Sequence, residues 1–231
     1  MKKPNRIFEI DALRGICIIG MVGVHLWMNY CDFFMSSHYP AFLQFFLDFG
    51  GILFVILSGI AVTLGHHPIR RGCIVFVAGL ICTAVTYGAD ALGLGVTPIW
   101  FGILHCLGAC MLLSPLLLKL PRPLLPLVGS AVVGLGLLTQ NTYVTTPYLF
   151  PLGLQTDAFT SGDYFPLIPY LGWFILGIFI GVTAYKTKTT LLPKVNAQCI
   201  PIKALCFCGR HSLWIYLAHQ PILYGIFYLV Q

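Results

Sequence analysis

Long apolar runs separated by short polar connections make up most of this sequence. Seven runs are expected to form helices, over residues 12–31, 44–65, 72–90, 99–118, 124–139, 166–185 and 211–230. Most of them approach the roughly 20 residues that an α-helix needs to cross the hydrocarbon core of a bilayer. The pattern predicts an all-α fold, a polytopic transmembrane helix bundle of about seven spans, in a single domain over residues 1–231.

The basic residues mark one side of the expected membrane. All thirteen fall in four groups, separated by pairs of apolar runs. The groups are Lys2, Lys3, Arg6 and Arg14; Arg70 and Arg71; Lys119 and Arg122; and Lys186, Lys188, Lys194, Lys203 and Arg210. Because cytoplasmic loops carry the excess of Lys and Arg, this distribution predicts a cytoplasmic N-terminus and a C-terminus outside.

Composition supports a multi-pass integral membrane protein. The chain is 58% hydrophobic and 9% charged, with mean hydropathy +0.88, whereas soluble domains carry about 25% charged residues. The net charge of +6 is scattered over inner loops, so it predicts contact with membrane lipid and no nucleic-acid partner. Most of the nine cysteines lie in apolar runs, where Cys behaves as a small hydrophobe, and no metal is expected.

Four ionisable residues fall inside the predicted spans: His25, Asp48, His105 and His219. Such residues are costly in a membrane and typically mark functional sites. At 1.5 Å per residue, His25 lies about 20 Å from the inner end of its helix and His219 about 12 Å. Asp48 and His105 lie roughly 6–9 Å below the outer ends of theirs. All four are therefore expected between the midplane and the outer third of the membrane.

A second set of residues is expected at the inner surface. The first, third and seventh runs start near Arg14, Arg71 and Arg210, two of them followed by glycine. Guanidinium groups and exposed helix N–H groups suit phosphate oxygens, and Asp11 lies one turn before Arg14, where it can orient that side chain. The predicted anion site consists of Arg14, Asp11, Arg71, Arg210 and Lys203.

Five sequence blocks carry a family resemblance. They are R-I-F-E-I-D-A-L-R-G-I-C-I-I-G-M-V-G-V-H (6–25), F-V-I-L-S-G-I (54–60), F-G-I-L-H-C-L-G (101–108), F-P-L-I-P-Y-L-G-W-F (165–174) and G-R-H-S-L-W-I-Y-L-A-H-Q-P-I-L-Y-G (209–225). In this order they resemble the membrane acyltransferases typified by heparan-α-glucosaminide N-acetyltransferase, most closely the short bacterial proteins grouped with that catalytic domain.

The resemblance implies acyl transfer across the membrane, here the bacterial cytoplasmic (inner) membrane. Acetyl-CoA or another acyl-CoA donates from the cytoplasm, and an amine or hydroxyl of a sugar or glycan accepts outside. It places the Arg14 region near the donor and gives histidine the chemistry at the outer side. In the animal enzymes an asparagine stands at about the place of His25. A histidine of the next outer loop also serves there, and His38 holds a comparable position in this chain.

Several interpretations remain open at the level of sequence. His25 or His38 acts as general base or as acyl carrier, while His105, His219 and Asp48 set tautomers and polarise the carbonyl. A proton-coupled transporter that uses the same intramembrane His and Asp residues is the alternative function. The sequence does not decide between a monomer and a homodimer.

Overall fold

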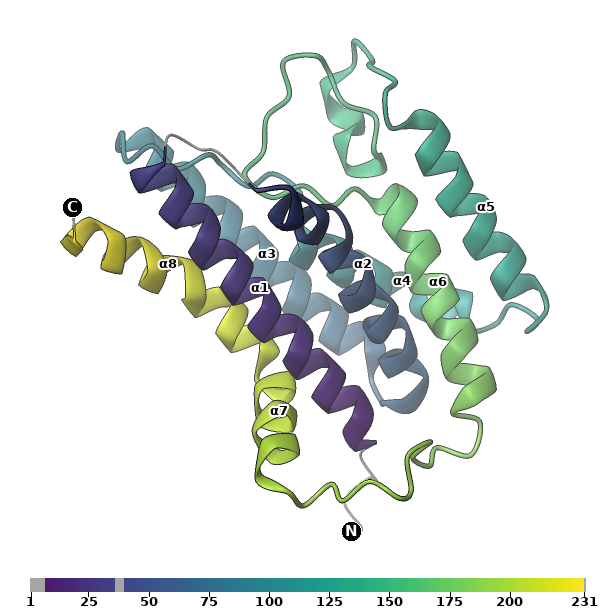
Figure 1. Cartoon of the computed structure of the whole chain (residues 1–231). Coiled ribbons are helices and arrows are strands. Elements are labelled where there is room, and N and C mark those ends of the chain that lie inside the picture. Colours follow the sequence, from purple (N-terminus) through teal and green to yellow (C-terminus); the bar gives the residue numbers. More distant parts are fainter. Residues whose placement is uncertain (1–6, 36–39, 231) are drawn as a thin grey trace. The chain divides into compact units, whose positions relative to one another are not determined.

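The computed structural model describes residues 7–35 and 40–230, without the side chain of Asp48 (Figure 1). These residues form eight α-helices and one 3-10 helix, and no β-strand occurs among them. The predicted all-α fold is confirmed. Contacts divide the chain into two compact units, Met1–Leu57 with Tyr185–Gln231, and Ser58–Ala184. The expectation of one domain over the whole chain stays a prediction.

All seven predicted runs form helices. Five are long and apolar enough to cross a membrane: α1 (Phe8–Phe34), α2 (Ala41–Leu64), α3 (Pro68–Ala91), α6 (Leu167–Ala184) and α8 (Ser212–Val230). Two apolar helices are shorter, α4 (Ile103–Leu117) and α5 (Leu124–Thr139). The length and hydropathy of these helices are those of an integral membrane protein. Which side each terminus faces stays a prediction.

Helices α1 to α4 begin three or four residues away from the expected starts, and two of these shifts have local reasons. Helix α1 begins at Phe8 rather than residue 12, and its first turn carries Glu9 and Asp11, which favour a helix N-terminus. Helix α4 begins at Ile103 rather than residue 99. The amide of Ile99 donates to Thr86 Oγ1 and its carbonyl accepts from Thr83 Oγ1, so this residue is bonded outside the helix.

Two further elements are not among the predicted runs. Helix α7 (Ile200–Arg210) precedes α8, and the 3-10 helix η1 (Pro147–Leu152) lies in the connection between α5 and α6. Both carry proline in their first turn, a position that suits the fixed φ of proline. With 11 residues, α7 is too short to cross a bilayer. Helix α7 ends at Arg210, His211 has non-helical backbone angles, and α8 begins at the next residue.

In the first unit, α1 and α8 lie side by side and run in the same direction (Figure 1). Their contacts advance together along both helices, from His25 against His219 to Phe33 against Phe227. This agrees with the predicted topology, in which the first and last spans run the same way. Helix α7 packs on the first turns of α1, where Gly15 and Gly209 allow backbone contact with Leu205 and Asp11.

The second unit packs α3 against α4 and α5 against α6 in antiparallel pairs, with Gly72, Gly108, Gly129 and Gly172 at the close approaches. The connection from α5 to α6 is ordered by Tyr164, whose hydroxyl donates to the carbonyl of Phe150 at 2.6 Å. Burial raises the pKa of that hydroxyl to about 12. The connection is therefore a built part of this unit.

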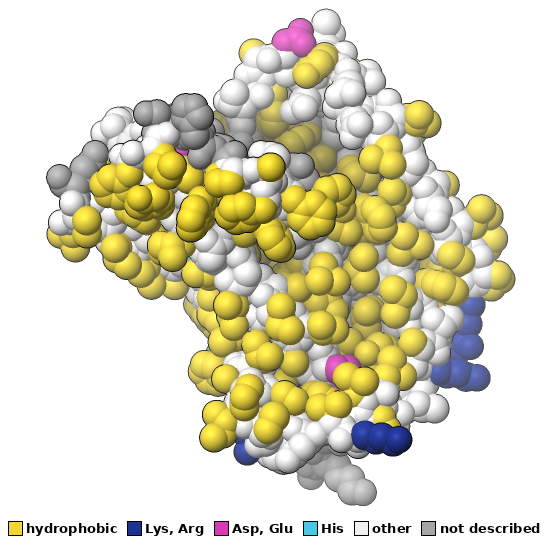
Figure 2. All heavy atoms as spheres, viewed as in Figure 1, with side chains coloured by type: hydrophobic (Ala, Val, Ile, Leu, Met, Phe, Trp, Pro, Cys, Tyr) yellow, Lys and Arg dark blue, Asp and Glu magenta, His cyan; other side chains and the backbone are white. Residues whose placement is uncertain are grey.

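Apolar side chains cover most of the face shown in Figure 2, and Lys and Arg form only small groups on it. Many large apolar residues of the long helices are exposed, among them Ile16 and Ile19 of α1, Val85 of α3 and Leu229 of α8. Soluble domains rarely expose apolar patches of this extent. Such a surface is suited to lipid.

Candidate active site

A pair of histidines joins α1 to α8 within the first unit. His25 Nδ1 lies 2.7 Å from His219 Nε2, and the two rings stack with centroids 4.9 Å apart. The other ring nitrogen of His219, Nδ1, bonds to the backbone carbonyl of Tyr216, one turn earlier on α8. His219 is 6% exposed and His25 is half-buried. The structure therefore brings two of the predicted intramembrane histidines into direct contact.

This hydrogen-bond pattern decides which ring nitrogen of each neutral histidine carries the proton. The carbonyl of Tyr216 can only accept, so His219 Nδ1 carries hydrogen and His219 Nε2 presents a lone pair. His25 Nδ1 must then donate to that lone pair. Neutral histidine has one N–H and one acceptor nitrogen, so His25 Nε2 is left as the basic atom. The chain from Tyr216 through His219 thus fixes the tautomer of His25.

A second polar pair lies beside the histidines and was not predicted. Asn29, one turn after His25, donates from Nδ2 to Oε1 of Gln220 at 3.1 Å. Asn29 is 3% exposed. The signal was present in the sequence, because Asn29 is four residues after His25 and Gln220 directly follows His219. The two pairs form a continuous polar contact between α1 and α8.

His105 belongs to the second unit and has a different environment. Its Nδ1 accepts the backbone N–H of Gly102 at 3.2 Å, at the start of α4. That bond leaves its Nε2 as the donor, 3.3 Å from Thr83 Oγ1, whose own hydroxyl donates to the Ile99 carbonyl. His105 is 2% exposed, and its two nitrogens bond to Gly102 at the start of α4 and to Thr83 of α3. A catalytic role for His105 stays a prediction.

Two predicted site residues fall outside what the structure describes. His38 lies between the described stretches. Asp48 lies on α2, within the part of that helix that belongs to the first unit, and its side chain is not described. Their roles stay predictions.

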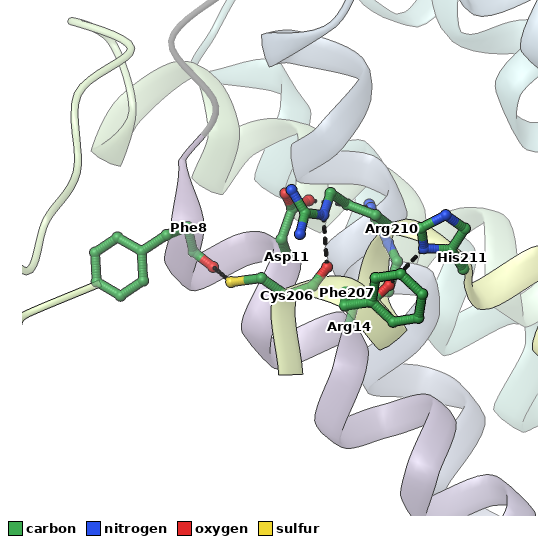
Figure 3. Close-up of polar contacts among 7 residues, drawn as sticks. All are labelled: Phe8, Asp11, Arg14, Cys206, Phe207, Arg210 and His211. Carbon is green, nitrogen blue, oxygen red and sulfur yellow. Dashed lines mark hydrogen bonds and ion pairs between the residues drawn. The ribbon is translucent and has the colours of Figure 1, made fainter. Parts of the chain in front are cut away.

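The predicted anion-binding residues are divided between the units. Arg14, Asp11, Lys203 and Arg210 lie in the first unit, where α7 packs on α1 (Figure 3), and Arg71 lies in the second. Asp11 Oδ1 is 3.9 Å from Arg14 Nη1, as expected for a carboxylate that orients this side chain. Arg210 donates from Nε to the carbonyl of Cys206 at 3.0 Å. The structure therefore gathers four of the five residues in one unit.

The expected exposed helix starts next to Arg14 and Arg71 are corrected by the structure. Arg14 lies in the second turn of α1, and Gly15 and Gly72 are buried. A side chain at Gly15 would strike the backbone of Leu205, and one at Gly72 would crowd Gly108 and Leu112. These glycines therefore serve close helix packing, and their amides lie inside helices. Any anion site here depends on the side chains.

The thiol of Cys206 lies under this cluster and donates to the carbonyl of Phe8 at 3.4 Å (Figure 3). Burial raises the pKa of Cys206, the carboxylate of Asp11 raises it further, and the cation of Arg210 lowers it. The protonated thiol is thus the stable form. Within residues 7–35 and 40–230 no group of three or more His, Cys, Asp or Glu side chains is placed to hold a metal ion.

Comparison with known proteins adds one finding. Residues 6–221 match the family described as "Heparan-alpha-glucosaminide N-acetyltransferase, catalytic". The chain belongs to this family. The match spans nearly all of the described helices and contains both members of the histidine pair. Neither the curated proteins nor the solved structures contain a significant match to the chain.

Membership of the heparan-α-glucosaminide N-acetyltransferase catalytic family gives the chain an acetyltransferase-like function in the membrane. It confirms the resemblance that the five sequence blocks carried. The match does not favour the alternative of a proton-coupled transporter.

Proposed function

We propose that this protein transfers an acyl group, in the first instance acetyl, from cytoplasmic acyl-CoA to an extracytoplasmic acceptor. The acceptor is an amine or hydroxyl of a sugar or glycan, and the membrane is the bacterial inner membrane. The observation that carries the proposal is the histidine pair, in which His25 Nε2 is the basic atom. Family membership supplies the reaction class.

The thioester of acyl-CoA is already activated, so the reaction needs position and a proton acceptor. In direct transfer, the acceptor N or O attacks the thioester carbonyl carbon while His25 Nε2 takes its proton. The new C–N or C–O bond forms, the C–S bond breaks, and the thiolate of CoA receives the proton. A base of this kind contributes roughly 10²–10⁴-fold to the rate.

A second route uses the same atom as a nucleophile. His25 Nε2 attacks the carbonyl carbon and the C–S bond breaks, so that CoA leaves as a thiolate. The acceptor N or O then attacks the acyl group, the bond to His25 Nε2 breaks, and the proton of the acceptor passes through that nitrogen to the thiolate. In both routes the charge that develops on His25 is stabilised through Nδ1, which donates to His219. His219 is therefore a positioning residue. The roles of His38 and Asp48 remain those predicted from the sequence. Both nitrogens of His105 are engaged, by Gly102 and Thr83, which supports a structural role for this residue.

The donor phosphates are assigned to the cationic side chains of the first unit, Arg14, Arg210 and Lys203, with Asp11 orienting Arg14. A role for Arg71, which lies in the second unit, stays a prediction from the sequence. Guanidinium forks bind phosphate oxygens with two parallel hydrogen bonds. Arg14 lies eleven residues before His25 on α1, which corresponds to about 16 Å along the helix. An extended pantetheine arm is suited to such a separation between phosphates and thioester.

The test is the melting temperature of the purified full-length protein with and without acetyl-CoA, with free CoA as a second ligand. Ligand at 100 times its dissociation constant stabilises by about 2.7 kcal/mol. The shift is expected to shrink in Arg14→Ala and to persist in Arg122→Ala, a matched change of an arginine outside the proposed site. Absence of any shift at millimolar ligand, together with proton-coupled uptake of a solute, would overturn the proposal.

A further inference from the structure

Helix α7 has two different faces. Cys206 and Gly209 are buried against α1. On the other face Ile200, Ala204 and Phe207 follow at helical spacing, and Ile200 and Phe207 are 82% and 56% exposed. Residues at i, i+4 and i+7 lie on one side of a helix. Helix α7 therefore presents a largely exposed apolar strip, on which His211 contacts only the ring of Phe207 among the described aromatic contacts.

Every charged side chain within residues 186–210 is basic. The exposed cations Lys186, Lys188 and Lys194 lie in the connection before α7, and Lys203 and Arg210 lie beside the strip. No Asp or Glu occurs after Asp163 in the sequence. Exposed apolar residues alternate with the cations of the connection: Leu191, Leu192 and Val195. The surface formed by residues 186–210 is thus cationic and apolar without any acidic residue.

The connection is held against the start of α1. The carboxylate of Glu9, which is 5% exposed, accepts the N–H of Leu191 at 2.7 Å and the hydroxyl of Thr190 at 2.9 Å. This anchor fixes the middle of the connection to the first unit. The surface of residues 186–210 is therefore a defined part of the fold.

We infer that the surface of residues 186–210 docks on anionic phospholipid, with α7 lying in the plane of the membrane interface. Short helices with an apolar strip and flanking cations bind in this way, with the apolar side chains among the acyl chains. Clusters of Lys and Arg next to a spanning helix attract anionic headgroups. Trp214, 70% exposed in the first turn of α8, lies where aromatic residues prefer the interface.

Charge complementarity indicates which ligand binds the surface of residues 186–210. An anionic lipid offers both a phosphate for the lysines and an acyl chain for the strip, whereas a free phosphate offers only the first. This inference goes beyond the proposed acyl transfer and does not depend on it. Lys203 and Arg210 also belong to the proposed donor site, so the test leaves both unchanged.

The test titrates the full-length protein in neutral detergent with short-chain phosphatidylglycerol and follows the melting temperature. Phosphatidylcholine of the same chain length and inorganic phosphate serve as comparison ligands. Each lysine near an anionic surface contributes about fivefold to binding. The midpoint is the phosphatidylglycerol concentration that gives half of the full shift in melting temperature. It is expected to rise by about 100-fold in the triple variant Lys186→Gln, Lys188→Gln, Lys194→Gln. The control variant Lys119→Gln, Arg122→Gln is expected to leave it unchanged.

A second variant tests the apolar strip. Ile200→Ser is expected to raise the phosphatidylglycerol midpoint and to leave stabilisation by acetyl-CoA intact. Equal midpoints for the two lipids, an unchanged midpoint in the triple variant, or equal stabilisation by inorganic phosphate would overturn the inference. So would loss of the acetyl-CoA shift in the triple variant, because the lysines would then serve the donor. A phosphatidylglycerol shift without any acetyl-CoA shift would contradict the proposed function alone.

Discussion

The two units each bury a histidine on a helix of the membrane domain, and the two sites differ in what is left for chemistry. In the second unit, both nitrogens of His105 are engaged, one by Gly102 before α4 and the other by Thr83 of α3. In the first unit, the hydrogen bonds that link Tyr216, His219 and His25 leave the lone pair of His25 Nε2 available. The difference shows that burial of a histidine is not sufficient evidence of function. The direction of its hydrogen bonds decides.

The largest effect is expected from removal of the basic atom. His25→Ala should lower kcat by about 10²–10⁴-fold, because no group then takes the acceptor proton. Stabilisation by acetyl-CoA should be retained. The matched control is His66→Ala, a change of an exposed histidine outside the site, which should keep wild-type activity. Unchanged transfer in His25→Ala would remove His25 from the mechanism.

The next effect concerns His219, which acts only through His25. His219→Phe preserves a stacked ring and removes the acceptor of the His25 N–H. Hydrogen bonds to charged groups contribute about 1.5–3 kcal/mol, so kcat should fall about 10- to 100-fold. KM for the donor should not change. His219→Gln, whose Oε1 can accept the same hydrogen, should recover part of the rate. Equal loss in both variants would contradict a positioning role.

His105→Ala should affect stability more than rate. Loss of this side chain leaves the buried N–H of Gly102 without its partner, at a cost of about 1–3 kcal/mol. Thermal unfolding measures this loss, and kcat of the folded protein should stay near wild type. A drop in kcat similar to that of His25→Ala at an unchanged melting temperature would instead place His105 in the reaction centre.

The smallest effect is a pH dependence in the second unit. The pKa of Tyr164 is raised to about 12, above the ordinary value of about 10. The folded state therefore holds the phenolic proton more tightly than the unfolded state does. The contribution of this difference to the stability of the fold is fully present below pH 10. It should be lost as pH rises from 10 towards 12, which lowers the melting temperature.

Tyr164→Phe should reduce that pH dependence and cost about 0.5–1.5 kcal/mol at neutral pH, because its hydrogen bond to Phe150 is lost. Tyr148→Phe is the matched control, since Tyr148 of η1 is 81% exposed. An identical pH profile in wild type and Tyr164→Phe would show that this hydroxyl does not titrate in that range.

The spans were predictable because a bilayer imposes length and hydropathy on each helix, and α5 begins and ends at the expected residues. Helix α7 was not, because its apolar strip of Ile200, Ala204 and Phe207 is short and interrupted by Lys203. Depth along each helix brought His25 and His219 to similar heights. It did not show which helices are neighbours, so the contact itself and the separate environment of His105 required the structure.

The first unit combines the two ends of the chain, Met1–Leu57 and Tyr185–Gln231. During synthesis, α1 enters the membrane long before α8 leaves the ribosome, so His25 has no partner until α8 has been made. A chain that stops before α8 inserts most of its helices and lacks the histidine pair. Copies of the chain that lack α8 are therefore expected to be inert, whatever else of the bundle they have inserted.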